Sequence, residues 1–221
     1  ADLIQAHHES ARQQGTRIIP FAGFDSVPSD LGALLCAEAL RSRGTSTRRV
    51  VSAFKLRGGL NGGTVASALA MSTSGRMRDL RDVLLLNPEN HRSEDERRRS
   101  RDVTWPVYED ALDCWLAPFV MAPINSRVVR RSNALFKETG AHYGDEFEYV
   151  EGYESRGRVS ALMMAFGLKC VDTLLRYGPG RALVKAMSPS PGRGPSQETM
   201  DNGFFRTRLR AEGEDGSRVG L

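Results

Sequence analysis

Apolar residues recur along the chain at two spacings, one typical of helices and one typical of strands. Helical spacing runs through residues 3–14 and returns at Leu31, Leu34 and Leu35, in a helix that Gly44 would end. Further helices are predicted at residues 64–71, 77–86, 127–136 and 159–176. We therefore expect helices along most of the chain.

Strand-like patterns fall between these predicted helices. A short buried strand is predicted at residues 17–22, although Pro20 cannot donate a hydrogen bond to a neighbouring strand. Alternation is cleanest at residues 204–211, where three of the intervening side chains are arginines. Further strands are predicted at residues 50–56 and 147–153. This mixture of helices and strands predicts the α/β fold class.

The composition narrows the classes of function. A formal net charge of +4 favours anionic partners but is too small to predict nucleic-acid binding. The three cysteines lie far apart and the four histidines show no metal-ligand spacing, so we expect a reducing, cytoplasmic location and no metal site. The longest apolar stretch, residues 159–175, contains Lys169 and Asp172 and is too short to span a bilayer.

Four collinear stretches carry motifs. They are residues 18–31, which include GFDSVPSDL, residues 62–67, residues 122–135, which include RVVRRSNAL, and residues 191–196 followed by 203–205. Together they resemble the saccharopine-dehydrogenase-like oxidoreductases, and especially the branch that contains the mycobacterial trans-acting enoyl reductases. The GFDSVPSDL stretch is specific by itself, and the RVVRRSNAL stretch supports it.

The resemblance implies how the chain is organised. Residues 1–30 would be the end of a Rossmann-like dinucleotide-binding domain, and residues 31–221 a mixed α+β substrate and dimerisation domain, truncated at its carboxyl end. Members of the family begin with a glycine-rich loop that holds the cofactor pyrophosphate at a helix N-terminus. No stretch of this sequence matches that loop. The chain is therefore expected to be a fragment that is inactive alone.

The resemblance also implies a function. The full-length protein would be an NAD(P)-dependent oxidoreductase that transfers a hydride from NADPH, or from NADH, to an enoyl substrate of acyl or lipid type, small or carrier-bound. One alternative is a saccharopine-type amino-acid dehydrogenase that acts on an imine. Another is a non-catalytic interaction module or degenerate fragment. A homodimer and a peripheral membrane contact are the candidate associations.

By the same resemblance, the loop at residues 23–30 faces the nicotinamide and the substrate. The alternative is helix-start chemistry alone, because Ser26 can cap a helix, Pro28 suits a first turn and Asp30 complements the helix dipole. The candidates for cofactor binding are Gly23, Phe24, Asp25 and Ser26, and Ser29 is a candidate for substrate binding.

Arginines in the third motif are further candidates for substrate binding. Arg127, Arg130 and Arg131 share one face of a predicted helix and could hold a phosphate or a carboxylate. The alternative is a solvated face paired with nearby acids. Asn125 belongs to the same motif.

The remaining candidates are less specific. Gly62, Gly63 and Thr64 could contact substrate at a helix N-terminus, or could form only a tight turn that Thr64 caps. The catalytic residues are not identified by the sequence. Candidate proton donors are Tyr108, Tyr143 and Tyr153.

Overall fold

A computed structural model describes residues 2–58, 62–188 and 194–221 and shows one mixed six-stranded sheet. The strand order is β2-β3-β4-β1-β5-β6. The central pair, β1 and β4, is parallel, and every other neighbouring pair is antiparallel. The strands are β1 (Thr47–Arg57), β2 (Val107–Glu109), β3 (Cys114–Ala117), β4 (Glu148–Ser155), β5 (Phe204–Gly213) and β6 (Arg218–Gly220).

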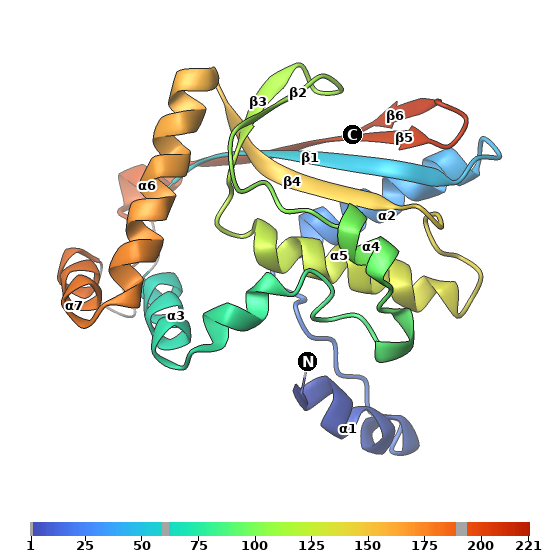
Figure 1. Cartoon of the computed structure of the whole chain (residues 1–221), viewed down its shortest axis with the longest axis horizontal. Helices are drawn as coiled ribbons and strands as arrows, with labels where there is room; N and C mark the ends of the chain where they lie inside the picture. The colour runs from blue at the N-terminus through green and yellow to red at the C-terminus, as the bar shows by residue number, and fades with distance from the viewer. Residues whose placement is uncertain (1, 59–61, 189–193) are drawn as a thin grey trace.

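Eight α-helices and two short 3-10 helices lie within the described residues. In Figure 1, α2 and α5 lie side by side against one face of the sheet, while α6, α3 and α7 gather at one end of it. The helices are α1 (Asp2–Gln13), α2 (Val27–Arg41), α3 (Gly62–Thr73), α4 (Glu94–Arg99), α5 (Ala122–Lys137), α6 (Arg158–Arg176), α7 (Gly178–Met187) and α8 (Gln197–Asp201), with η1 (Arg76–Arg81) and η2 (Glu89–His91).

The main core forms between α2, α5 and the sheet. Small and medium side chains of α2 at helical spacing, from Ala33 to Leu40, pack on Val50 of β1 and on Leu209 and Ala211 of β5. Of the three leucines whose spacing predicted this helix, Leu34 packs partly buried against this core, whereas Leu31 and Leu35 are both more than half exposed. The spacing therefore identified the helix but not its buried face.

The two faces of β5 differ as its alternating sequence predicts. Leu209 and Ala211 are buried against the helices. On the opposite face, Arg206 and Arg208 form ion pairs with Glu154 of β4. The register of β5 along β1 runs over almost the whole length of both strands, so the predicted strand at residues 204–211 is confirmed and extended.

Two predicted elements are wrong. Residues 17–22 form no strand, and Ile18 and Ile19 are exposed, because no described strand lies beside them to accept their hydrogen bonds. The helix predicted at residues 77–86 is only the 3-10 helix η1, followed by turns. The sequence also gave no signal for the short strands β2 and β3.

The mixed α/β class is confirmed, whereas the division into two domains remains a prediction. In Figure 1, α1 lies apart from the sheet, joined to α2 by the extended stretch that contains Ile18. The helix α6 exposes Val159, Met163 and Phe166 along one side. None of the described helices is long and apolar enough to cross a membrane.

Candidate functional site

The N-termini of α2 and α5 meet over the middle of the parallel strands β1 and β4, and the loops that precede these helices lie toward the carboxyl ends of the strands. They converge on Glu151, a β4 side chain that is only 1% exposed. Open sheets bind ligands beyond the carboxyl ends of their parallel strands, and helix N-termini favour negative charge. This end of the molecule is therefore the candidate site.

Three donors satisfy the Glu151 carboxylate. The Ser29 hydroxyl and the Tyr149 hydroxyl donate to its Oε2, each at 2.7 Å. The Asn125 side-chain amide donates to its Oε1 at 2.8 Å. The Ser26 hydroxyl in turn donates to Asn125 Oδ1 at 2.9 Å. The result is a buried network that ties the start of α2 and the start of α5 to β4.

Burial sets the protonation of this network. Removal of water raises the pKa of Glu151, and the hydrogen bonds from Tyr149, Ser29 and Asn125 oppose that rise without cancelling it. Burial also holds the pKa of Tyr149 well above its ordinary value. The network therefore resists the loss of a proton more strongly than the same groups would in water.

Ser26 is not the cap that the sequence predicts. Its side chain makes no capping hydrogen bond, because the hydroxyl turns inward to Asn125. The other two helix-start features are confirmed, since Pro28 lies in the first turn of α2 and Asp30 is the acidic residue there. The loop is therefore more than a helix start, because two of its serines are used to reach other elements.

The outer part of the loop is exposed. Gly23, Phe24 and Asp25 face solvent, and a Cβ at position 23 would meet no atom within 4 Å. The Phe24 ring, 66% exposed, packs edge-on against Phe205 at 4.7 Å between ring centroids. The row of rings continues inward through Phe54 to Phe119, so the loop rests on an apolar base.

This geometry allows a test of fit for the dinucleotide that the resemblance implies. The open backbone at Gly23 and the exposed Phe24 ring can lie against a flat ring. The Ser26 hydroxyl is already donated to Asn125 and faces inward. A pyrophosphate needs a glycine-rich turn of defined spacing at a helix N-terminus, and the glycine turn before α3 does not have that spacing. The residues fit one end of the cofactor and not its phosphates.

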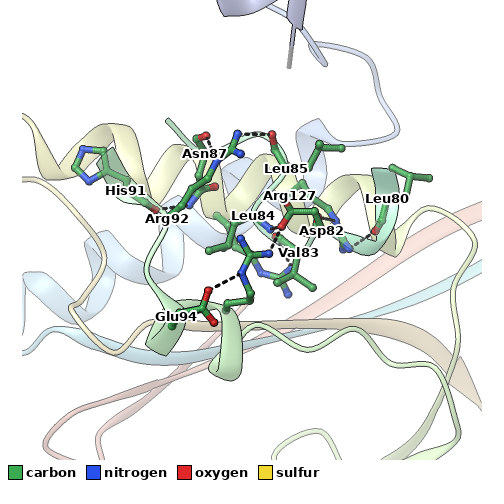
Figure 2. A network of polar contacts seen from close by, with 12 residues as sticks. Leu80, Asp82, Val83, Leu84, Leu85, Asn87, His91, Arg92, Glu94 and Arg127 are labelled. Carbon is green, nitrogen blue, oxygen red and sulfur yellow. Dashed lines mark hydrogen bonds and ion pairs between the residues drawn. The ribbon is translucent and has the colours of Figure 1, made fainter. Parts of the chain in front are cut away.

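Arg127 and Arg130 lie away from solvent, so the solvated-face alternative does not describe them. Arg127 is 1% exposed, and its Nη1 contacts both Asp102 oxygens, at 2.6 and 2.7 Å. Its other nitrogens donate to the main-chain carbonyls of Leu80 and Asp82, as Figure 2 shows. Arg130 donates to the carbonyls of Val83 and Tyr149.

These contacts give the arginines a structural task. The segment after η1 has little regular structure, so its carbonyls need donors from elsewhere. Arg92 supplies two more, to Asn87 and Leu85 (Figure 2). The third member of the predicted trio, Arg131, lines two clefts beneath α1, and it too donates to a carbonyl of this segment, that of Leu86.

The glycine candidates at the start of α3 are separate from the network. The helix begins at Gly62, so Thr64 lies within its first turn rather than at its cap, and Gly63 is exposed. Residues 59–61 of this glycine turn, and residues 191–193 of the fourth motif, lie outside the described residues. The role proposed for Gly62, Gly63 and Thr64 stays a prediction.

The three candidate tyrosines are scattered. Tyr108 is exposed at the edge strand β2 and bonds to Asp113. Tyr143 is buried in the main core, where burial raises its pKa. Tyr153 lies near the row of phenylalanine rings and donates to the carbonyl of Leu56 at 3.1 Å. Tyr153 is the one of the three beside the candidate site.

Sequence reasoning missed Glu151 and Tyr149. A signal was present, because residues 147–153 alternate and Glu151 falls on the same side of the strand as Tyr149 and Tyr153. A carboxylate in the buried phase of a strand needs partners, and here it has three. A charged residue on the same side of the strand as two tyrosines would have identified Glu151 from the sequence.

The chain has relatives among known proteins. No family model matches it, and no solved structure matches it. A protein of Mycobacterium tuberculosis named as a trans-acting enoyl reductase is 34% identical over 97% of this chain and 55% of its own length. The trans-acting enoyl reductase of Mycobacterium ulcerans is 30% identical over the same shares, and that of Mycobacterium bovis is 31% identical over 91% and 52%.

The first two of these relatives match the chain from near its first residue to near its last. The first two aligned regions cover 97% of the chain, so they include the network around Glu151 as well as the motif at residues 18–31. The chain spans about half the length of the curated relatives it matches. Over nearly its entire length it is a homologue of mycobacterial proteins that are named trans-acting enoyl reductases.

Proposed function

We propose that this chain forms the substrate side of an NAD(P)-dependent enoyl reductase. The position of the loop at residues 23–29 carries the proposal. The Glu151 network fixes this loop near the carboxyl ends of β1 and β4. The loop also lies within the stretch that aligns with enoyl reductases. Its exposed part is then a wall of the reaction site. We infer a small or carrier-bound acyl substrate of lipid type.

The residues of this chain would act by positioning. Asp25 faces solvent beside Gly23, so its carboxylate can orient a polar group of the substrate or of the nicotinamide. The rings of Phe24 and Phe205 would exclude water from the reacting atoms. Ser26, Ser29 and Asn125 would act indirectly, by holding the loop in place. Their side chains make hydrogen bonds within the buried network.

The cofactor, NADPH or NADH, would supply the hydride. We propose that residues beyond these 221 hold its pyrophosphate, since no stretch of this sequence has the spacing of the phosphate-binding glycine turn. The 221-residue chain alone should then show no saturable NADPH binding and no turnover. Calorimetric titration of NADPH into the isolated chain tests this. Saturable binding at micromolar concentration would mean that the chain contains a phosphate site of its own.

The alternative of a saccharopine-type dehydrogenase requires side chains that clamp several substrate carboxylates. Arg127, Arg130 and Arg131 were the candidates for that clamp. Arg127 and Arg130 are buried with internal partners, and Arg131 donates to the carbonyl of Leu86. Among the described residues, no observation favours this alternative. A homodimer and a membrane contact remain predictions, for which the exposed apolar side of α6 is the natural surface.

A substrate panel tests the proposed reaction. The protein expressed from its complete gene would be mixed with NADPH and either a 2-enoyl thioester or a 2-oxo acid with an amino acid. We expect oxidation of NADPH with the thioester and none with the imine-forming pair. Oxidation with the pair alone would replace the proposal with the dehydrogenase alternative.

A further inference from the structure

A second cleft lies at the same end of the sheet, with a volume of about 390 Å³. It opens where β1 and β4 end and α6 begins. Lys55 and Arg57 line it from β1, Glu154 from β4, Arg156 from the following turn and Met164 from α6. Its size lies within the range of pockets that hold small organic ligands.

The one acid of this cleft is already neutralised. Glu154 pairs with Lys55 at 3.2 Å, with Arg206 at 3.3 Å and with Arg208 at 3.0 Å. Its hydrogen bond to Lys55 and its attraction to Arg208 hold its pKa below the ordinary value despite partial burial, so it stays a carboxylate. The positive charge of the other lining residues is therefore not cancelled within the cleft.

Two cationic side chains of the cleft make no hydrogen bond or ion pair with the described residues. The guanidinium groups of Arg57 and Arg156 are exposed, and neither makes a hydrogen bond or an ion pair with any of the described residues. This distinguishes them from Arg127 and Arg130, whose guanidinium groups donate hydrogen bonds to other residues of the protein. A guanidinium with free nitrogens is suited to bidentate contact with a carboxylate or a phosphate.

The rest of the lining is largely apolar. Leu56 and Phe204 are partly exposed there, and Met164 adds a flexible thioether side chain. Tyr153 contributes its ring, since its hydroxyl is donated to the Leu56 carbonyl. An anion that fits these walls carries an apolar chain as well as its charge, which a free inorganic ion or a polyanion does not.

We propose that this cleft binds an amphipathic anion, a short apolar chain that ends in a phosphate or a carboxylate. Arg57 and Arg156 hold the anionic group, and Leu56, Met164 and Phe204 hold the chain. The inference goes beyond the reduction proposed above and does not require it. Binding is measured without turnover, so the two proposals can fail separately.

Calorimetry on the protein expressed from its complete gene tests the inference with four probes: octyl phosphate, octanoate, inorganic phosphate and octanol. At least one of the two amphipathic anions should saturate the site, and whichever binds more tightly identifies the anionic group. Inorganic phosphate and octanol should each bind at least about tenfold more weakly, since each lacks half of the contacts.

Matched variants separate a site from general positive charge. Arg57→Gln with Arg156→Gln should weaken the amphipathic anion at least about tenfold. Arg81→Gln with Arg98→Gln removes two other exposed, unpaired arginines and should leave binding unchanged. Circular dichroism confirms that each variant is folded. The proposal is overturned if neither anion saturates, if the first pair leaves affinity unchanged, or if both pairs lower it equally.

Discussion

Glu151 has three hydrogen-bond donors around its carboxylate and almost no exposure to water. Removing water from a charge is costly, and hydrogen bonds offset only part of that cost. The raised pKa of Glu151 follows from this imbalance. Single residues therefore set both the geometry of the candidate site and its response to pH.

The first prediction concerns that response. The unfolded chain releases the Glu151 proton near pH 4.5, and the folded chain releases it at higher pH. Between these two values the folded state binds more protons, so its stability falls as pH rises. Glu151→Gln cannot release a proton. The free energy of unfolding of wild type minus that of Glu151→Gln should therefore fall from pH 4.5 upward, and a difference that rises would contradict the raised pKa.

The second prediction concerns Ser26. Ser26→Ala removes the donor to Asn125 Oδ1 and leaves a buried acceptor without a partner, which should cost about 1–3 kcal/mol. Ser42→Ala, at the exposed end of α2, is the matched control and should change stability by less than about 0.5 kcal/mol. Urea unfolding measures both. Equal small effects would mean that the Ser26 hydroxyl does not contribute to the network.

The third prediction concerns Asp25. Its side chain is exposed and makes no hydrogen bond or ion pair with the described residues, so Asp25→Ala should leave the melting temperature unchanged. If Asp25 orients a reacting group, turnover of the protein expressed from its complete gene should fall roughly tenfold or more. Asp110→Ala, at another exposed acid, serves as the control. Wild-type kinetics in Asp25→Ala would remove this side chain from the site.

At the scale of elements, α5 stabilises two different parts of the structure. Its first turn delivers Asn125 to the Glu151 network, and its next turn delivers Arg127 and Arg130 to the irregular segment after η1. The helical spacing of the three arginines was visible in the sequence. Their burial was not, because it depends on carbonyl groups of a segment some forty-five residues earlier in the chain.

The fourth prediction concerns the contacts of Arg127 and Arg131 with the segment after η1. Arg127→Gln leaves Asp102 without its closest cation and leaves the carbonyls of Leu80 and Asp82 without this hydrogen-bond donor. The variant should therefore lose about 3–5 kcal/mol of stability. Arg131→Gln loses one carbonyl contact and should cost about 1 kcal/mol. Denaturant unfolding of the two variants gives the comparison. If Arg131→Gln lowered the free energy of unfolding more than Arg127→Gln, Arg127 would not be the main stabiliser of this segment.

Other elements show why periodicity alone has limits. The strand at residues 204–211 was predictable because its two faces differ so strongly in polarity. The stretch at residues 17–22 has strand-like composition, yet strand structure needs a neighbour, and the described residues provide none. The strands β2 and β3 are three and four residues long, too short to show a period.

At the scale of the whole molecule, the motifs found in the sequence come together only in part. Ser26, Ser29 and Asn125 meet around Glu151, although ninety-nine residues separate Ser26 from Asn125. Such long-range meetings follow from the parallel pairing of β1 with β4, which brings both helix N-termini together over these strands. No local pattern in the sequence encodes that pairing.

The central claim is that this end of the sheet is one wall of a site where a hydride passes from a nicotinamide to an enoyl group. Deuterium transfer tests it directly. The protein expressed from its complete gene would be incubated with NADPH deuterated at the transferring carbon and a 2-enoyl thioester, and the product analysed by mass spectrometry. We predict a saturated thioester that carries deuterium, formed much more slowly by Asp25→Ala. Folded protein that yields no deuterated product would contradict the account.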